Sequence, residues 1–263
     1  MKKLIYSLIV FALLAGAQSC YFHFDDQICM SGFGTIVSEE ISLEDFNSIE
    51  NQTVVDVEVI QGDQQMVTVE GHQNMIDQLD LTVHGSELSI ELRDGCYNNF
   101  KLKVYITVPE LEKVSVKSTG NVYIDDFENI ESLVLSSSST GDIIGTGVLD
   151  VLDLVELKTS STGNIKLELY TTTLIAEMNG TGNITLEGSC VDQDIEMSGT
   201  GNYKAYDLES ESCTVKVSGT GDAKLNVSEE LDIRINSVGN VYYKGTPRLT
   251  IHDSGIGDII HID

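Results

Sequence analysis

Apolar and polar side chains alternate along the second half of the chain, and the alternation itself repeats. A Gly followed by Asn or Asp recurs eight times after residue 110, at intervals of 18 to 22 residues. Counted from each glycine, the positions six and four before it and two after it are mostly apolar, and the positions between them are mostly polar. A helix would need apolar residues every three or four positions, so this pattern predicts strands with one buried face.

Each repeat contains a position where only small residues occur. The residue two places before every glycine is Ser or Gly. We expect this residue and the glycine to point into a narrow corner, where the glycine also lets the backbone turn. Asn and Asp bond readily to nearby backbone groups, so their stacking on successive coils predicts a ladder. The ladder positions are Gly120, Asn121, Gly141, Asp142, Gly163, Asn164, Gly182, Asn183, Gly201, Asn202, Gly221, Asp222, Gly239, Asn240, Gly257 and Asp258.

The repeat length indicates the fold class. A period near 20 residues is too long for one strand and too short for a four-stranded blade. It fits one coil of two or three short parallel strands that rises by about 4.8 Å. The sequence therefore predicts an all-β protein, a single-stranded, right-handed parallel β-helix with coils of about 20 residues. A coil cannot bury its inner face alone, so stability must come from stacked neighbours.

The organisation along the chain follows from where the repeat is regular. We expect residues 110–263 to form eight regular coils, and residues 41–109 contain less regular alternating stretches, which we interpret as the first coils of the same body. Residues 41–263 are thus one β-helical domain. Residues 20–40 are interpreted as a tether and residues 1–19 as a signal peptide.

The N-terminus has the features of a secretory signal. Lys2 and Lys3 precede an apolar run of about eleven residues, well under the roughly 20 that a membrane-spanning helix needs. Cys20 follows small residues, as in the acceptor site of a bacterial lipoprotein. We expect a lipid at Cys20 to hold the protein at the outer membrane, facing the cell surface or the periplasm. The alternative is ordinary cleavage after Ala17, which would leave Cys20 unmodified.

Four cysteines remain for an oxidising compartment. They contain no Cys-x-x-Cys pair, which argues against a zinc site. One interpretation is that these cysteines form the disulfides Cys29–Cys96 and Cys190–Cys213. The alternative is that all four are unpaired thiols.

The net charge of the chain argues against some classes of binding partner. The chain has 15 basic and 42 acidic residues, a formal net charge of −27. Such a chain lacks the basic face that nucleic-acid binding requires, and it has no basic patch for an anionic bilayer. Membrane contact is therefore expected only through the N-terminal lipid.

One outward column is rich in hydrogen-bonding and aromatic groups. The residues three places after each corner glycine are Tyr123, Ile144, Lys166, Thr185, Lys204, Lys224, Tyr242 and Ile260. We take Tyr123, Lys166, Lys204, Lys224 and Tyr242 as candidate contacts for a host or bacterial glycan or protein. The alternative is a solvated strand face with no ligand.

Several stretches resemble a known family. They are Phe46–Ile49, Val57–Asp63 and Val67–Gly71, with Val108–Leu111 leading into the first corner at Ser118–Val122. Together they resemble the putative auto-transporter adhesin, head GIN domain family of Bacteroidetes, over about residues 41–263. The resemblance implies a β-helical extracytoplasmic domain, often lipid-anchored, with an adhesin role and no catalytic motif.

These observations favour a non-catalytic binding or adhesion module of the cell envelope. One alternative is a structural envelope protein that self-associates through its solenoid ends, and a weaker one is a carbohydrate-active enzyme. β-Helical lyases need clustered carboxylates with a basic residue, and basic residues are few here. Calcium-binding β-rolls repeat every nine residues, unlike this chain. We therefore expect no catalytic residue, no metal and no cofactor.

Overall fold

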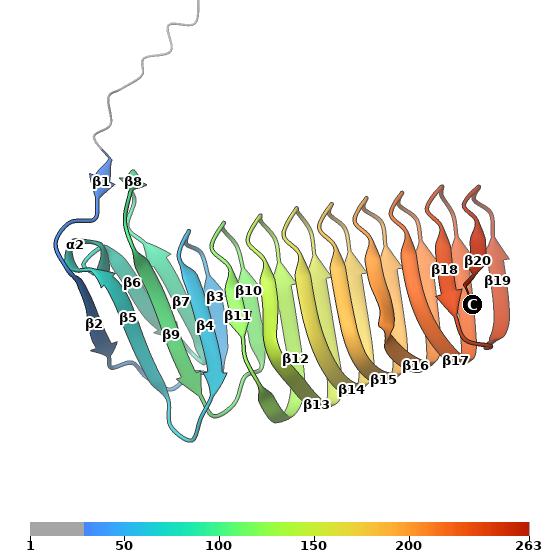
Figure 1. The fold of residues 1–263 in the computed structure, drawn as a ribbon, viewed down its shortest axis with the longest axis horizontal. Helices are drawn as coiled ribbons and strands as arrows, with labels where there is room; N and C mark the ends of the chain where they lie inside the picture. Colours follow the sequence, from blue (N-terminus) through green and yellow to red (C-terminus); the bar gives the residue numbers. More distant parts are fainter. Residues whose placement is uncertain (1–28, 263) are drawn as a thin grey trace, which may run out of the picture.

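The computed structural model describes residues 29–262, so Cys20 and the signal peptide lie outside the described residues. Strands make up 64% of the structure and helix 2%. The chain forms an elongated β-solenoid of about 7 turns, which runs from the blue N-terminal end to the red C-terminal end in Figure 1. The predicted all-β solenoid is thus confirmed.

The elements follow one another along the rod. They are β1 (Met30–Ser31), β2 (Ile36–Ile41), β3 (Ser48–Asn51), β4 (Asp56–Gln61), β5 (Met66–His72), α2 (Gln73–Ile76), β6 (Leu79–His84), β7 (Glu87–Leu92), β8 (Tyr97–Asn98), β9 (Leu102–Val108), β10 (Lys113–Val116), β11 (Val122–Ile124), β12 (Phe127–Ser137), β13 (Ile143–Thr159), β14 (Ile165–Met178), β15 (Ile184–Met197), β16 (Tyr203–Val217), β17 (Ala223–Ile235), β18 (Val241–Lys244), β19 (Arg248–Asp253) and β20 (Ile259–His261).

Each coil contributes to two sheets. The chain leaves a corner, runs down one sheet, bends, and returns up the other sheet to the next corner (Figure 1). In β13 to β17 both runs belong to one long strand, and register shifts mark the bend in several of them. We call the sheet that follows each corner glycine the post-corner sheet and the sheet that precedes it the pre-corner sheet.

The alternation in the sequence matches the burial in the structure. Ile143, Ile165 and Ile184 stack in register on successive coils and are fully buried. The same column continues through Tyr203, Ala223 and Val241, also at 0% exposure. The core is therefore a continuous apolar column between the two sheets, and the residues between the buried ones face solvent.

The corner glycines are needed because the coils approach closely there. A Cβ on Gly201 would lie 2.0 Å from the carbonyl oxygen of Gly182, and one on Gly221 would lie 1.8 Å from that of Gly201. Neither glycine has a positive φ, nor do the other corner glycines. The expected role in turning the backbone is therefore wrong, and the requirement is steric, since any side chain would strike the preceding coil.

The Asn and Asp residues after the glycines form a hydrogen-bonded ladder. The backbone N–H and Nδ2 of Asn183 both donate to Oδ1 of Asn164, at 2.9 and 3.0 Å. Backbone N–H donors at the other rungs lie 2.7–3.1 Å from the side-chain oxygen one coil before. The ladder begins at Asp56, which accepts from Asn121. Asp56 follows Val55 rather than a glycine, so the sequence motif does not reveal it.

The N-terminal region differs from the expected series of coils. Only β3, β4, β7 and β9 run parallel to their solenoid-side neighbours. Strands β2 and β9 each pair antiparallel with β5, and β6 pairs antiparallel with β7. In α2, Met75 and Ile76 are buried, and Figure 1 shows this helix at the N-terminal end of the rod. We call residues 29–109 the cap.

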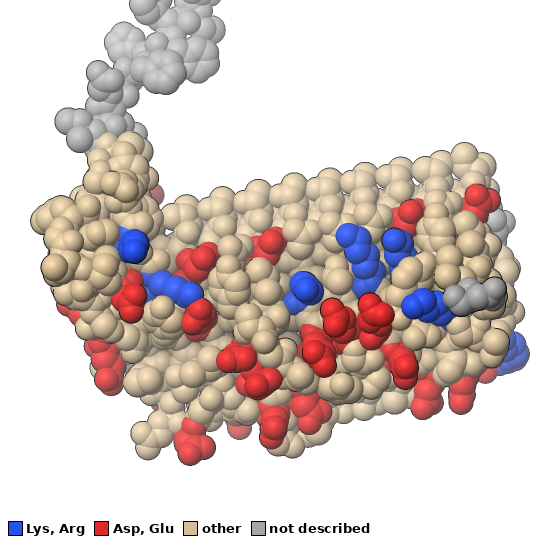
Figure 2. All heavy atoms as spheres, in the orientation of Figure 1, with Lys and Arg blue, Asp and Glu red and all other residues tan. Residues whose placement is uncertain are grey.

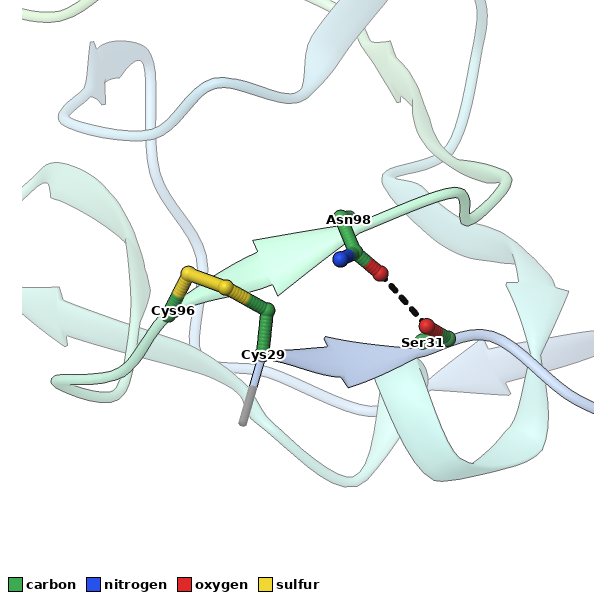
Figure 3. The surroundings of a disulfide bond; sticks show 4 residues. All are labelled: Cys29, Ser31, Cys96 and Asn98. Carbon is green, nitrogen blue, oxygen red and sulfur yellow. Dashed lines mark hydrogen bonds between the residues drawn. A yellow bond between two sulfur atoms is a disulfide. The ribbon is translucent and has the colours of Figure 1, made fainter. Parts of the chain in front are cut away.

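The segment interpreted as a tether is ordered from residue 29 onward. Cys29 and Cys96 form a disulfide, and the adjacent β1 and β8 pair in parallel (Figure 3). Further along, β2 pairs along its whole length with β5. The tether prediction is therefore wrong for residues 29–40, because antiparallel pairing and the disulfide attach them to the cap.

The other two cysteines are buried, free thiols. Burial, aided by the charge of Asp192, raises the pKa of Cys190 to about 12. Burial also raises the pKa of Cys213 well above its usual value. Both thiols therefore stay protonated and unreactive at neutral pH. The disulfide Cys190–Cys213 does not form, and the alternative of unpaired thiols applies to this pair.

Candidate functional site

The candidate ligand contacts stack in one outward row on the post-corner sheet. Tyr123 pairs with Ile144, and the row continues through Lys166 and Thr185. It then reaches Lys204, Lys224 and Tyr242 on adjacent coils. The regular corner keeps the register, so these side chains repeat at the coil spacing of about 4.8 Å.

Two lysines face each other directly in this row. Lys204 and Lys224 are Cα partners on neighbouring parallel strands. Like charges directly opposite each other destabilise a sheet. Among residues 29–262, none of the ion pairs involves Lys166, Lys204, Lys224 or Lys244. In this part of the chain these four lysines have no ion-pair partner, although the protein carries 42 acidic residues.

Two residues beside this row, Tyr206 and Lys244, were not identified from the sequence. The ring of Tyr206 has Lys224 Nζ at 5.8 Å and Lys244 Nζ at 4.9 Å from its centroid, within cation–π range. Burial raises the pKa of Tyr206, with smaller contributions from Tyr242 and Asp222. A register shift lies just beyond Lys204, so Tyr206 has no equivalent in the repeat and no positional signal.

We call Lys166, Lys204, Lys224, Lys244, Tyr206 and Tyr242 the lysine patch. Figure 2 shows basic side chains gathered over the C-terminal half of this face. Above them the corner edge of the rod is almost free of charge, and below them acidic side chains are frequent. The patch is thus a local cationic surface on an acidic protein.

Tyr123 does not belong to the patch. It lies four coils from Lys204, which is roughly 19 Å along the rod at the spacing of parallel strands. Its cationic neighbour is Lys103, whose Nζ lies 5.6 Å from the Tyr123 ring centroid. Lys103 forms an ion pair with Glu58, and the hydrogen bond to that carboxylate raises the pKa of the lysine. The charge is therefore neutralised at this end of the row.

On the pre-corner sheet, two neighbouring like charges each form an ion pair. Lys216 and Arg234 are also Cα partners on neighbouring strands. Lys216 Nζ, however, lies 2.6 Å from a carboxylate oxygen of Glu196, and Arg234 lies 3.1 Å from Asp232. Each like charge on this face has its own acidic partner.

No cluster of metal-binding side chains is present in the part of the chain that the structure describes. No group of three or more His, Cys, Asp or Glu side chains there could hold a metal ion. A hollow of about 980 Å³ near the first solenoid coils is lined by several carboxylates. Its lysine, Lys113, is already paired with Glu87. None of the described helices is long and apolar enough to span a bilayer.

Solved structures share this architecture. A putative adhesin from Parabacteroides distasonis has 22% identity and a TM-score of 0.79, over 88% of this chain and 99% of its own. A putative lipid binding protein from the same species has 18% identity and a TM-score of 0.73, over 89% of this chain and 99% of its own. A putative adhesin from Bacteroides fragilis has 24% identity and a TM-score of 0.59, over 89% of this chain and 100% of its own. At these identities the likeness establishes the fold.

No curated protein matches the sequence. One family model does match, over residues 45–247, which is most of the chain and includes most of the cap and the coils that carry the lysine patch. The protein therefore belongs to the family described as putative auto-transporter adhesin, head GIN domain.

Proposed function

We propose that the protein is a non-catalytic binding module of the cell envelope that serves in adhesion. Its ligand surface is the lysine patch, and its ligand carries repeated anionic groups, such as the carboxylates or sulfates of a glycan. The observation that carries this proposal is the set of four lysines that form no ion pair with any residue of the described range 29–262, two of them in direct register. The adhesin description of the family supports the general class.

The charge distribution favours an anionic ligand. Elsewhere on the solenoid, basic residues have acidic partners, so the patch keeps a repulsion that an anion would relieve. A ligand that carries several negative charges along one chain would contact successive coils at a spacing of about 4.8 Å. The Tyr206 and Tyr242 rings add apolar area beside the cations, which suits the faces of sugar rings.

The test compares two charge reversals of equal size. Lys204→Glu with Lys224→Glu reverses the patch, and Lys216→Glu with Arg234→Glu makes the same change on the pre-corner sheet. We expect only the first double variant to lose binding on an array of sulfated, uronic-acid and neutral glycans. Added salt should weaken wild-type binding because exposed charges are screened, and a chelator should have no effect. Unchanged binding by the first variant would remove the patch from the proposal.

We further propose that the mature protein is anchored to the outer membrane by a lipid on Cys20, facing the cell surface or the periplasm. The short apolar run before a cysteine supports this. Mass spectrometry of the mature N-terminus tests it directly. A chain that begins at Gln18 with an unmodified Cys20 would show ordinary signal cleavage instead.

A further inference from the structure

Within residues 29–262, no further strand pairs with the last coil of the solenoid. Strands β19 and β20 are the last strands of the two sheets, and they pair with β17 and β18 on one side. Ile251 is 48% exposed, whereas Ile233, on which it stacks, is fully buried. Leu249 is 39% exposed and its neighbour Leu231 1%. The last coil therefore presents both apolar side chains and unpaired strand edges.

The opposite end of the rod is protected. The edge strand β2 carries Glu39 and Glu40, and charges on an edge strand oppose edge-to-edge pairing. Met75 and Ile76 of α2 add buried apolar side chains at this end. In contrast, β20 reads Ile-Ile-His and has no acidic residue, and β19 carries its charged residues, Arg248 and Asp253, only at its two ends. The centre of β19 and the whole of β20 therefore lack the acidic residues that protect β2.

We propose that the C-terminal end pairs with the same end of a second copy, around a twofold axis perpendicular to the sheets. The axis places β19 antiparallel to its counterpart in one sheet and β20 antiparallel to its counterpart in the other. A partner must present two strand edges separated by the thickness of a two-sheet core. A second copy of this chain presents that spacing, and a twofold arrangement makes the contact self-complementary.

The residue pattern of β19 fits this pairing. In an antiparallel pair, directly opposite residues lie on the same face of the sheet. Pairing centred on Thr250 places Thr250 opposite its own counterpart and Leu249 opposite Ile251 of the other copy. Thr–Thr and apolar cross-strand pairs are favourable. The exposed inward residues of the two copies would then continue the apolar column.

The low net charge of the C-terminal coils favours self-association at this end. The chain as a whole carries a net charge of −27, so two copies repel each other over most of their surfaces. From Val241 onward the sequence has two basic and three acidic residues, so its net charge is close to zero. Two copies therefore approach with little repulsion at the place where the strand edges are open.

The geometry has a consequence for adhesion. The cap lies at the end of the rod opposite β19 and β20 (Figure 1), so the proposed dimer would place its two caps at the far ends of a rod of double length. If each chain is anchored through Cys20, as proposed above, one dimer would link two membrane surfaces. The pairing itself does not depend on the anchor or on the lysine patch.

The first experiment measures association of the chain from residue 21 onward, which omits the signal peptide and Cys20, by sedimentation equilibrium. We expect a concentration-dependent dimer that Ile251→Lys abolishes, because a charge would face the apolar contact. Leu152→Lys is the control, since Leu152 is similarly exposed, at 57%, but lies far from the end. Circular dichroism of both variants verifies the fold. A monomer at every concentration overturns the proposal and leaves the edge to a strand from another protein.

The second experiment tests the register. Thr250→Cys should form a disulfide with its counterpart across the twofold axis under mild oxidation. Thr214→Cys is the control, because Thr214 occupies the same outward row two coils earlier. Peptide mapping should find the Thr250→Cys crosslink alone. A dimer that persists with Ile251→Lys, or equal crosslinking by both cysteine variants, contradicts pairing at this end.

Discussion

The cap and the regular solenoid bury similar apolar strands by different means. In the solenoid, each coil repeats one corner and pairs with strands about 20 residues away in the sequence. In the cap, parallel and antiparallel strands meet in one small region, and a disulfide joins residues separated by 67 positions. The solenoid therefore distributes its stabilising contacts evenly, whereas the cap depends on a few non-local ones.

This difference predicts how each region responds to a single lesion. Nearest-neighbour repeats lose stability locally, and the remaining coils keep their own contacts. A non-local constraint limits the unfolded chain over its whole loop, so its loss affects the entire enclosed region. Changes to the disulfide, to a corner glycine and to the hydrogen-bonded ladder test this contrast, from the largest expected effect to the smallest.

The largest effect is expected from Cys29→Ser with Cys96→Ser. Opening a loop of this length should cost about 4 kcal/mol on the chain-entropy model. Denaturant unfolding should then show the cap melting before the solenoid, in two separate transitions. Reduction of the wild-type protein should reproduce this result, and the double variant should not respond to reductant. A single unchanged transition would mean that the disulfide contributes little to the cap.

A smaller effect is expected from Gly199→Val within the solenoid. A Cβ at Gly199 would lie 1.9 Å from the carbonyl oxygen of Gly180, so the coils must separate locally. Overpacking of this kind costs about 3 kcal/mol at its upper end. Ser198→Val is the control, since Ser198 is exposed and its change should stay within about 0.5 kcal/mol. Equal shifts of the denaturant midpoint would contradict the steric role of the corner.

The smallest effect is expected from the ladder. Asn183→Ala removes the oxygen that accepts from the backbone N–H and Nδ2 of Asn202, at a cost of about 1–2 kcal/mol. Asn183→Asp retains that acceptor and loses only the donation to Asn164, so it should cost less. Thermal unfolding of both variants measures the difference.

Asp56→Ala extends this test to the junction of cap and solenoid. Asp56 accepts from Asn121 in the same way as the rungs within the solenoid. If its loss costs as much as that of Asn183, the ladder stabilises the junction as it stabilises the coils. A negligible effect would mean that the cap holds the first coil by other contacts.

Because the sequence repeats, much of the fold could be predicted from it. Because one coil dictates the next, the inward column through Ile165 and Ile184 and the outward row through Lys204 and Lys224 follow from counting residues. Tyr206 could not be found in this way, since it lies beside a register shift. Counting residues also could not decide that Cys190 and Cys213 are free thiols and that Cys29 forms a disulfide with Cys96.

The sequence by itself determined the period, the buried face and the small corner, because these depend on residues within one coil and its immediate neighbours. The tertiary structure alone decided the antiparallel pairing of the cap, the first rung at Asp56 and the ordering of residues 29–40. It also decided which lysines have acidic partners, as the contrast between Lys224 and Lys216 shows. These features depend on contacts between distant segments, and no local periodicity encodes such contacts.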